Sequence, residues 1–459
     1  MNNPIARPAL AITTFVFCAF AGAPAMASAQ RPADLPLQFD ASGTFRTRYE
    51  HLWNSFQTMI PGNDMALSLR TNVLAELRFE SVGFAVELMD SRVYLADDDT
   101  PLNTTHVNPV DVLQAYMKTN VTGLFARGAQ LRLQLGRQTM DVGSRRFVAR
   151  NRFRNTINAF TGLDVEWTSP GEEGVRAFVT VPVQRRVNSI RDNEPQLDIE
   201  RTETIFWGAT FSPRRWPGSI RAEFQLYGIH ERDSDEYQTR NRNFVTPAIR
   251  LIRAPRPGLF DFEIETAVQT GTSRLTAQSA DTADLTHFAV FVHAAVGHTF
   301  PVTWQPRLVL QYDYASGDKD PADAKDGRFD TLYGARRFEY GPTGIYGAFA
   351  RSNVNSPGLR IEARPHTLID GFLAYRPYWL AQARDGWTTT SLQDVNGTSG
   401  TFLGHQIEGR VRWQVLKSNA TIETGFARLW LGGLPRNAPS GDPDRSDPIY
   451  GYAQLTLQI

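Results

Sequence analysis

Apolar and polar side chains alternate with a period of two along much of this chain. From Leu37 to Tyr49 the odd positions are mostly apolar or small and the even positions are polar, and the segment from Leu67 to Phe79 repeats the pattern. A period of two is typical of β-strands whose two faces meet different environments. The same alternation recurs, without helical spacing of apolar residues, in segments that include residues 131–135, 220–226, 260–265, 307–313 and 410–415.

The number of alternating segments predicts a closed transmembrane antiparallel β-barrel. At roughly 24 residues per strand with its turn or loop, a mature chain of about 430 residues gives about 16 to 20 strands, enough for a water-filled lumen. A soluble β-sandwich also alternates, but it has far fewer strands. A final strand from Tyr450 to Ile459 is expected to close against the first. Polar stretches rich in Gly, Pro, Asp and Asn predict long extracellular loops at residues 97–109, 187–202, 231–243, 315–328, 382–400 and 432–447.

The first 29 residues have the order of a secretory signal peptide. Arg7 precedes an apolar run from Ala9 to Gly22, and the small residues that follow predict cleavage near Ala29. The predicted division is therefore a signal peptide at 1–29 and a barrel at 30–459, delivered to the outer membrane of a Gram-negative cell. Cys18 is the only cysteine, so removal of the signal leaves a barrel without disulfides.

The charges of the chain balance, yet the basic residues are unusually uniform. Lys and Arg together number 48, as do Asp and Glu, so net charge gives no reason to expect a nucleic-acid partner. Only four of the basic residues are lysines. Arginine grips carboxylates with a planar fork and keeps its charge when partly dehydrated, although genomic base composition explains the bias equally well.

Several stretches resemble the alginate export (alginate porin) family. They are Gly136-Arg137-Gln138, residues 141–147 (DVGSRRF), Arg154-Asn155-Thr156 and Phe160-Thr161-Gly162, followed by residues 312–318 (YDYASGD), 329–333 (FDTLY) and 403–408 (LGHQIE). The resemblance spans most of the mature chain. It implies an outer-membrane barrel of about 18 strands that acts as a passive channel. For characterised members it implies export of an anionic polysaccharide through an arginine-rich pore.

The polar faces of the predicted strands carry many arginines that would line the lumen. The alternative for each arginine is an ion pair with a carboxylate on a neighbouring strand, which would keep the inner face of the wall polar without contacting a solute. The resemblance places residues 137–154 at a constriction, and an extracellular loop that binds lipopolysaccharide phosphates is the alternative for that stretch. The residues predicted to contact an anion are Arg46, Arg48, Arg70, Arg132, Arg137, Arg145, Arg146, Arg154, Arg307, Arg360, Arg410 and Arg412.

Three functions remain open on the sequence. The first is a passive channel for an anionic oligo- or polysaccharide, with lipid, lipopolysaccharide and periplasmic secretion proteins as expected partners. The second is a nutrient porin for small anions or sugars. The third is an outer-membrane hydrolase, which the absence of a Gly-x-Ser-x-Gly elbow disfavours. No cofactor is expected, and Asp318 and Asp320 are weak candidates for Ca²⁺ because their loop lacks calcium-loop spacing.

Overall fold

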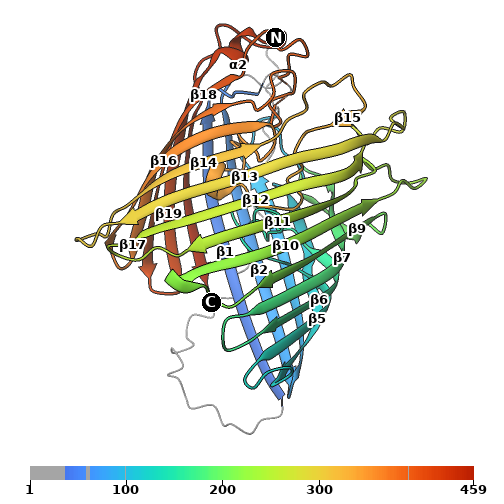
Figure 1. Ribbon diagram of the computed structural model, residues 1–459, viewed down its shortest axis with the longest axis vertical. Coiled ribbons are helices and arrows are strands. Elements are labelled where there is room, and N and C mark those ends of the chain that lie inside the picture. Colours follow the sequence, from blue (N-terminus) through green and yellow to red (C-terminus); the bar gives the residue numbers. More distant parts are fainter. Residues whose placement is uncertain (1–36, 58–61, 99, 391) are drawn as a thin grey trace, which may run out of the picture.

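Strand pairing in this chain follows sequence order and returns to its start. The computed structural model describes residues 37–459 except 58–61, 99 and 391, so the predicted signal peptide and its cleavage site lie outside the described residues. Eighteen of the described strands form one antiparallel wall, in which each strand pairs with the next and β20 pairs with β1 (Figure 1). Closure gives each wall strand a hydrogen-bonded neighbour on both sides along at least part of its length, as a barrel in a lipid environment requires. The all-β barrel predicted from the alternation is confirmed.

The wall strands differ in length from nine to seventeen residues. In the first half of the chain they are β1 (Leu37–Trp53), β2 (Asp64–Phe79), β3 (Val82–Tyr94), β4 (Asn108–Thr122), β5 (Gln130–Gln138), β6 (Phe160–Thr168), β7 (Gly174–Ser189), β9 (Thr204–Ser212) and β10 (Ile220–Glu231). In the second half they are β11 (Asn243–Arg253), β12 (Phe260–Ser273), β13 (Leu285–Thr299), β14 (Arg307–Ala315), β16 (Val354–His366), β17 (Ile369–Trp379), β18 (Phe402–Leu416), β19 (Ala420–Leu431) and β20 (Ile449–Gln458).

Five short elements lie in the connections. They are β8 (Glu194–Glu200), β15 (Lys325–Asp326), the 3-10 turn η1 (Pro217–Ser219), and the helices α1 (Arg337–Tyr340) and α2 (Gly433–Asn437). The strand β8 lies inside residues 187–202, where the sequence predicted only a loop. That prediction was wrong for residues 194–200, which pair with β7 as a hairpin. Among the described residues, no helix is long and apolar enough to cross a membrane.

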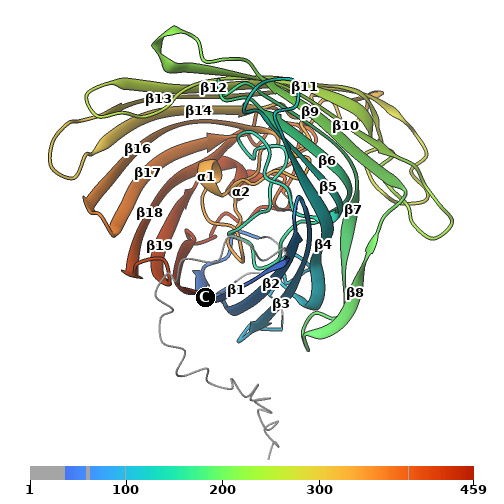
Figure 2. The ribbon, with the colours of Figure 1, turned by 90° about the horizontal axis from the view of Figure 1, so that it is seen from below.

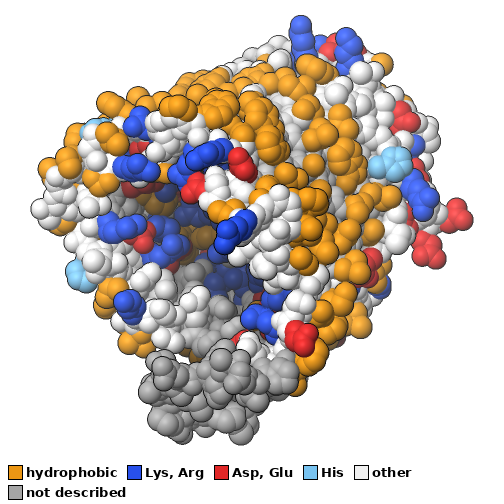
Figure 3. Space-filling view, turned by 60° about the horizontal axis from the view of Figure 1, so that its bottom comes forward, with side chains coloured by type: hydrophobic (Ala, Val, Ile, Leu, Met, Phe, Trp, Pro, Cys, Tyr) orange, Lys and Arg blue, Asp and Glu red, His pale blue; other side chains and the backbone are white. Residues whose placement is uncertain are grey.

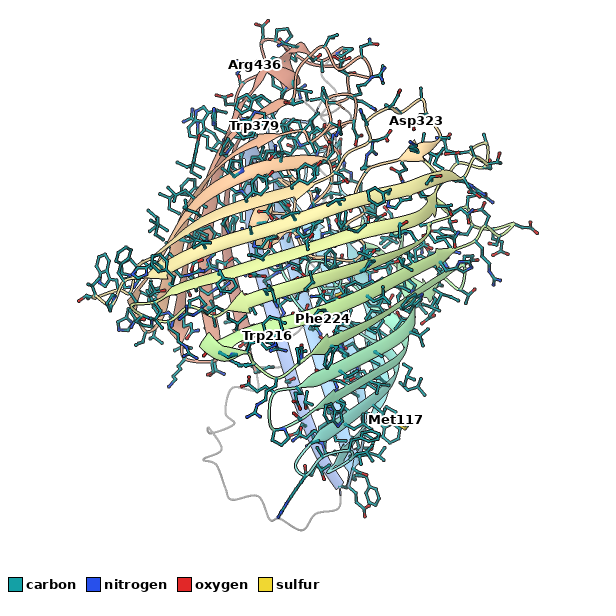
Figure 4. The ribbon with its side chains drawn as sticks, viewed as in Figure 1. Met117, Trp216, Phe224, Asp323, Trp379 and Arg436 are labelled. Atoms are coloured by element: carbon teal, nitrogen blue, oxygen red, sulfur yellow. The ribbon has the colours of Figure 1, made fainter. Side chains whose placement is uncertain are left out.

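The two faces of the wall strands differ as the alternation predicts. In β1 the polar residues Arg46, Arg48 and Glu50 are buried, while Phe39 is exposed. Side chains such as Met117 and Phe224 project from the outer face of the wall (Figure 4). The apolar outer face suits lipid, and the polar inner face lines the lumen.

The two ends of the barrel carry connections of different length. Short turns such as residues 80–81 and 417–419 join the strands at one end, and long segments such as 139–159 and 316–353 join them at the other. Short turns mark the periplasmic end of outer-membrane barrels and long loops the extracellular end. Two of the long segments, with α1, lie within the ring of strands (Figure 2). Much of the lumen is therefore filled by protein, including the buried rings of Phe147, Phe329 and Tyr346.

Candidate functional site in the barrel lumen

Two segments fold into the lumen and hold each other there. One joins β5 to β6 (residues 139–159), and the other joins β14 to β16 (residues 316–353); we call them the first and second inner loops. The backbone of Tyr333 donates to the Phe147 carbonyl at 3.0 Å, and Ala149 donates to the Tyr333 carbonyl at 3.2 Å. Gly334 lies so close to the first loop that a Cβ there would overlap the Arg146 carbonyl oxygen. The two loops therefore form one unit across the lumen.

A buried network of charges fixes this unit to the wall. Arg146 of the first loop contacts Glu265 of β12 at 2.5 Å and Glu339 of α1 at 2.9 Å. Arg351 contacts Glu339 at 2.8 Å and donates to the Arg146 carbonyl at 2.8 Å. We call Arg146, Arg351, Glu265 and Glu339 the clamp. Each of its charges is buried and compensated, so the clamp is part of the scaffold.

The wall arginines near the start of the chain also hold the first inner loop. Arg46 donates to the carbonyl oxygens of Arg152 at 2.8 Å and Arg154 at 2.9 Å. Arg48 donates to the Phe153 carbonyl at 2.6 Å, and Arg70 donates to the Arg154 carbonyl at 3.0 Å. Three residues predicted to contact a solute therefore bind backbone. Their fixed positions orient the arginine-rich part of the loop.

Three cavities in the lumen each adjoin a fourth, central one. We name them the central cavity, of about 470 Å³, the periplasmic cavity, of about 380 Å³, the extracellular cavity, of about 230 Å³, and the side cavity, of about 190 Å³. The central and periplasmic cavities share Arg360 and Arg410. Arg336 lines both the central and the extracellular cavity, and Arg154 lines both the central and the side cavity. Arg154 and Arg336 therefore lie where cavities adjoin.

The central cavity is lined by an unusual number of arginines. Seen from the periplasmic end, basic side chains lie in the depth of a hollow (Figure 3). Aromatic rings separate some of these cations, and the Arg360 guanidinium lies 3.8 Å from the centre of the Phe372 ring. The arginines that line the central cavity are Arg46, Arg145, Arg152, Arg154, Arg336, Arg337, Arg360, Arg410 and Arg412.

Most of these cavity arginines have a carboxylate partner. Arg337 contacts Glu408 at 3.3 Å, Arg360 contacts Glu362 at 2.9 Å, and Arg412 contacts Glu423 at 2.6 Å. Such pairs contribute little net charge to the cavity. The ion pairs between strands that the sequence left as an alternative are therefore present for part of the predicted set.

Arg154 and Arg336 differ from their neighbours. Within the described part of the chain, neither guanidinium has an ion pair, a hydrogen bond or an aromatic ring as a partner. Arg46 and Arg145 also lack a carboxylate, but Arg46 donates to backbone carbonyls and Arg145 lies over an aromatic ring. Burial lowers the pKa of Arg154, and burial together with the charges of Arg154 and Arg351 lowers the pKa of Arg336 to about 9. Both side chains remain partly exposed to the cavities. Two cations without partners in a dehydrated space favour an incoming anion, because an anion supplies the missing charge.

The other predicted site residues are distributed around the lumen and the wall. Arg145 lines the central cavity, with its guanidinium 4.7 Å from the centre of the Phe338 ring. Arg132 contacts Glu166 at 2.6 Å, and Arg307 contacts Glu362 at 2.9 Å in the wall of the periplasmic cavity. Arg137 lies apart from the cavities described above and contacts Glu200 of β8 at 2.8 Å.

Sequence reasoning missed several residues of the second inner loop. Arg336 and Arg337 are separated by two residues from the stretch at 329–333 that carries the family resemblance, and a doubled arginine there was the available signal. Arg351 had no such signal, since the Arg146 carbonyl that it binds lies 205 positions away in the sequence.

The acidic residues weighed for Ca²⁺ have other contacts. Asp318 accepts from the Gly327 backbone at 3.1 Å, and Asp320 contacts Arg384 at 3.1 Å. Over the described residues, no group of three or more His, Cys, Asp or Glu side chains is arranged to hold a metal ion.

Comparison with known proteins decides the family. The model of the alginate export family matches residues 37–446, which is nearly all of the described barrel. The chain belongs to the alginate export family. A comparison with curated proteins finds no match.

Solved structures share the fold of this family member at low identity. OccK2 (OpdF) of Pseudomonas aeruginosa, solved in complex with glucuronate, is 13% identical with a TM-score of 0.54, covering 92% of this chain and 98% of that one. OpdK of the same organism, solved with vanillate, is 12% identical with a TM-score of 0.55 and the same coverage. A BenF-like porin of Pseudomonas fluorescens Pf-5 is 11% identical with a TM-score of 0.58, again covering 92% and 98%. The protein is thus an outer-membrane porin of the alginate export family with the architecture of the Occ channels.

Proposed function

We propose that this porin is a passive channel for carboxylate-bearing anions, which cross the lumen through the central cavity. The observation that carries the proposal is the pair of uncompensated cations, Arg154 and Arg336, at the points where the cavities adjoin. A guanidinium binds a carboxylate with a planar fork, and the surrounding ion pairs keep the other charges balanced. Anions would therefore pass by weak contacts at successive positions, as conduction requires.

The size of the path favours short solutes over a polymer. The two inner loops are tied together by backbone hydrogen bonds and tied to the wall by the clamp, so widening the path would break buried charge pairs. Glucuronate and vanillate, present in the structures of OccK2 and OpdK, are small carboxylates. We infer that sugar acids and comparable monoanions are the solutes, and that passage of a long anionic polysaccharide is the second candidate. Hydrolysis is not part of the proposal.

Single-channel recording in planar bilayers tests the proposal. Glucuronate added to the wild-type channel should interrupt the current of small ions, because a bound solute occupies the central cavity. The double variant Arg154→Gln/Arg336→Gln should need about tenfold more glucuronate for the same block, the effect of losing about 1.4 kcal/mol of binding.

The control is Arg127→Gln, since Arg127 lies in the exposed turn between β4 and β5 and lines none of the four cavities. It should leave the block nearly unchanged. A double variant that is blocked as readily as the wild type would contradict the proposal. A block by long oligouronates but not by glucuronate would favour the polymer.

A further inference from the structure

The barrel wall has a gap in its extracellular part between β4 and β7. β5 and β6 have only nine residues each, because the chain between them turns into the lumen as the first inner loop. β4 pairs with β5 only as far as Ala115, and β7 pairs with β6 only as far as Pro182. The extracellular ends of β4 and β7 continue beyond these residues without β5 and β6 between them.

The hairpin formed by β7 and β8 covers this gap. β8 pairs with β7 from Val183 to Ser189 and packs against β4. Over the described residues, no backbone ladder joins β8 to β4. Side chains make the contact instead: the Asp198 backbone N–H donates to Asp111 Oδ2 at 2.7 Å, and Asn108 Nδ2 donates to Asp198 Oδ2 at 2.9 Å. We call this contact between β8 and β4 the seam.

The carboxylates of the seam share one ion-pair partner. Arg137 on β5 contacts Asp111 at 3.4 Å and Glu200 at 2.8 Å, so one guanidinium serves two carboxylates. Among the residues that the structure describes, the Asp198 carboxylate accepts only from the Asn108 amide at 2.9 Å and from the Arg186 backbone N–H at 2.8 Å. The charged groups that face Asp198 are Asp111 on β4, Arg137 on β5, Arg185 and Arg186 on β7, and Glu200 on β8.

Two neighbouring carboxyl groups in such a place share a proton readily. Burial, and next the Asp111 carboxylate, raise the pKa of Asp198 above its usual range. Because the docked hairpin binds this proton more tightly than a free hairpin would, docking is strongest below the ordinary carboxyl pKa. It weakens as the pH rises toward neutrality, when the proton leaves to solvent and both groups are charged.

The same hairpin supports the end of the first inner loop. The Val183 N–H donates to the Ala159 carbonyl at 3.0 Å. Arg185 Nη1 donates to the Ile157 carbonyl at 3.2 Å and to Asn158 Oδ1 at 3.0 Å. Arg185 and Arg154 also line the side cavity together. A displacement of the hairpin would therefore reach the loop that carries Arg154.

We propose that the β7–β8 hairpin is a proton-controlled support of the channel. A proton on Asp198, which faces Asp111, keeps β8 docked on β4, and its loss releases the hairpin and loosens the first inner loop. The device goes beyond anion transport, since it sets the rigidity of the channel whatever solute crosses it.

Hydrogen–deuterium exchange of the refolded full-length chain tests this device. Amides of residues 190–203 should exchange about tenfold faster at pH 8 than at pH 5 after correction for intrinsic rates, because the deprotonated hairpin is released more often. Asp198→Asn should abolish the difference and keep exchange slow at both values, because the amide removes the charge as a proton does. Asp111→Asn, on the other side of the seam, should also abolish the difference in exchange between the two pH values. The second variant keeps the test valid if Asp198→Asn fails to fold.

The control is Asp192→Asn, on the same hairpin, where the carboxylate accepts from Ser189. It should retain the wild-type pH response. Exchange that is independent of pH in the wild type, or a pH response that survives in both seam variants, would overturn the proposal. Because exchange is measured without solute, this result is independent of whether the channel conducts sugar acids.

Discussion

The clamp and the pair Arg154 and Arg336 use the same side chain for opposite purposes. Arg146 in the clamp contacts Glu263, Glu265 and Glu339, each within 2.9 Å. Arg154 and Arg336 lie in the same two inner loops, deep in the same lumen, and have no carboxylate partner among the described residues. The comparison teaches that an arginine in a barrel lumen is informative about function only once its partners are known. A compensated arginine holds the loops, and an uncompensated one leaves a charge for a solute.

Breaking the clamp should have the largest effect of any single change. Arg146→Ala would leave Glu265 buried without a cation and Glu339 with Arg351 alone, and removing one partner of a buried ion pair costs about 3–5 kcal/mol. We expect a lower unfolding temperature, which can be measured from the change in gel mobility when the barrel is heated. We also expect a larger and noisier single-channel current, because the inner loops loosen. Arg152→Ala, at an exposed pair, should change neither. A variant as stable as the wild type would show that the clamp is not structural.

Changing the shape of an uncompensated cation should have a smaller effect. Arg336→Lys keeps the charge but loses the planar fork, so anion preference should persist while glucuronate block weakens about fivefold, the effect of about 1 kcal/mol. Titration of the block in planar bilayers measures the change. If anion preference disappears with lysine in place, charge at this position is not what selects the solute.

Altering the pH should affect the anion preference least. The pKa of Arg336 is lowered to about 9, and a cation with a lowered pKa loses its charge only as the pH rises through that value. The guanidinium is therefore charged throughout pH 5–8. In Asp198→Asn, whose hairpin stays docked at every pH, the ratio of anion to cation permeability should be flat over this range. A fall in this ratio between pH 6 and 7 would point to a histidine as the selecting group.

The alternation of side chains was sufficient to predict the wall. It predicted the faces of β1 and β2 correctly, including the inward direction of Arg46, Arg48 and Arg70. It could not predict that these arginines bind the backbone of a loop about a hundred residues away, because a period of two describes a strand and not what fills the lumen.

The sequence could not predict which arginines have carboxylate partners, for a similar reason. Arg146 and Glu339 are 193 positions apart, and nothing local pairs them. For Arg137 the alternation was informative. Arg137 stands at an odd position, like Leu133 and Leu135, and the odd positions of this strand belong to the outer face. The family resemblance placed it at the constriction, whereas the structure places it at the seam with β8.

The most direct test of the account is the reversal potential across a salt gradient. Arg154→Gln/Arg336→Gln removes two uncompensated charges, and we predict that it lowers the ratio of anion to cation permeability about tenfold. Arg360→Gln/Glu362→Gln removes an ion pair from the neighbouring wall without changing the net charge, and it should leave the ratio close to that of the wild type. Equal effects of the two double variants, or no effect of the first, would contradict the claim that the unpaired arginines select the solute.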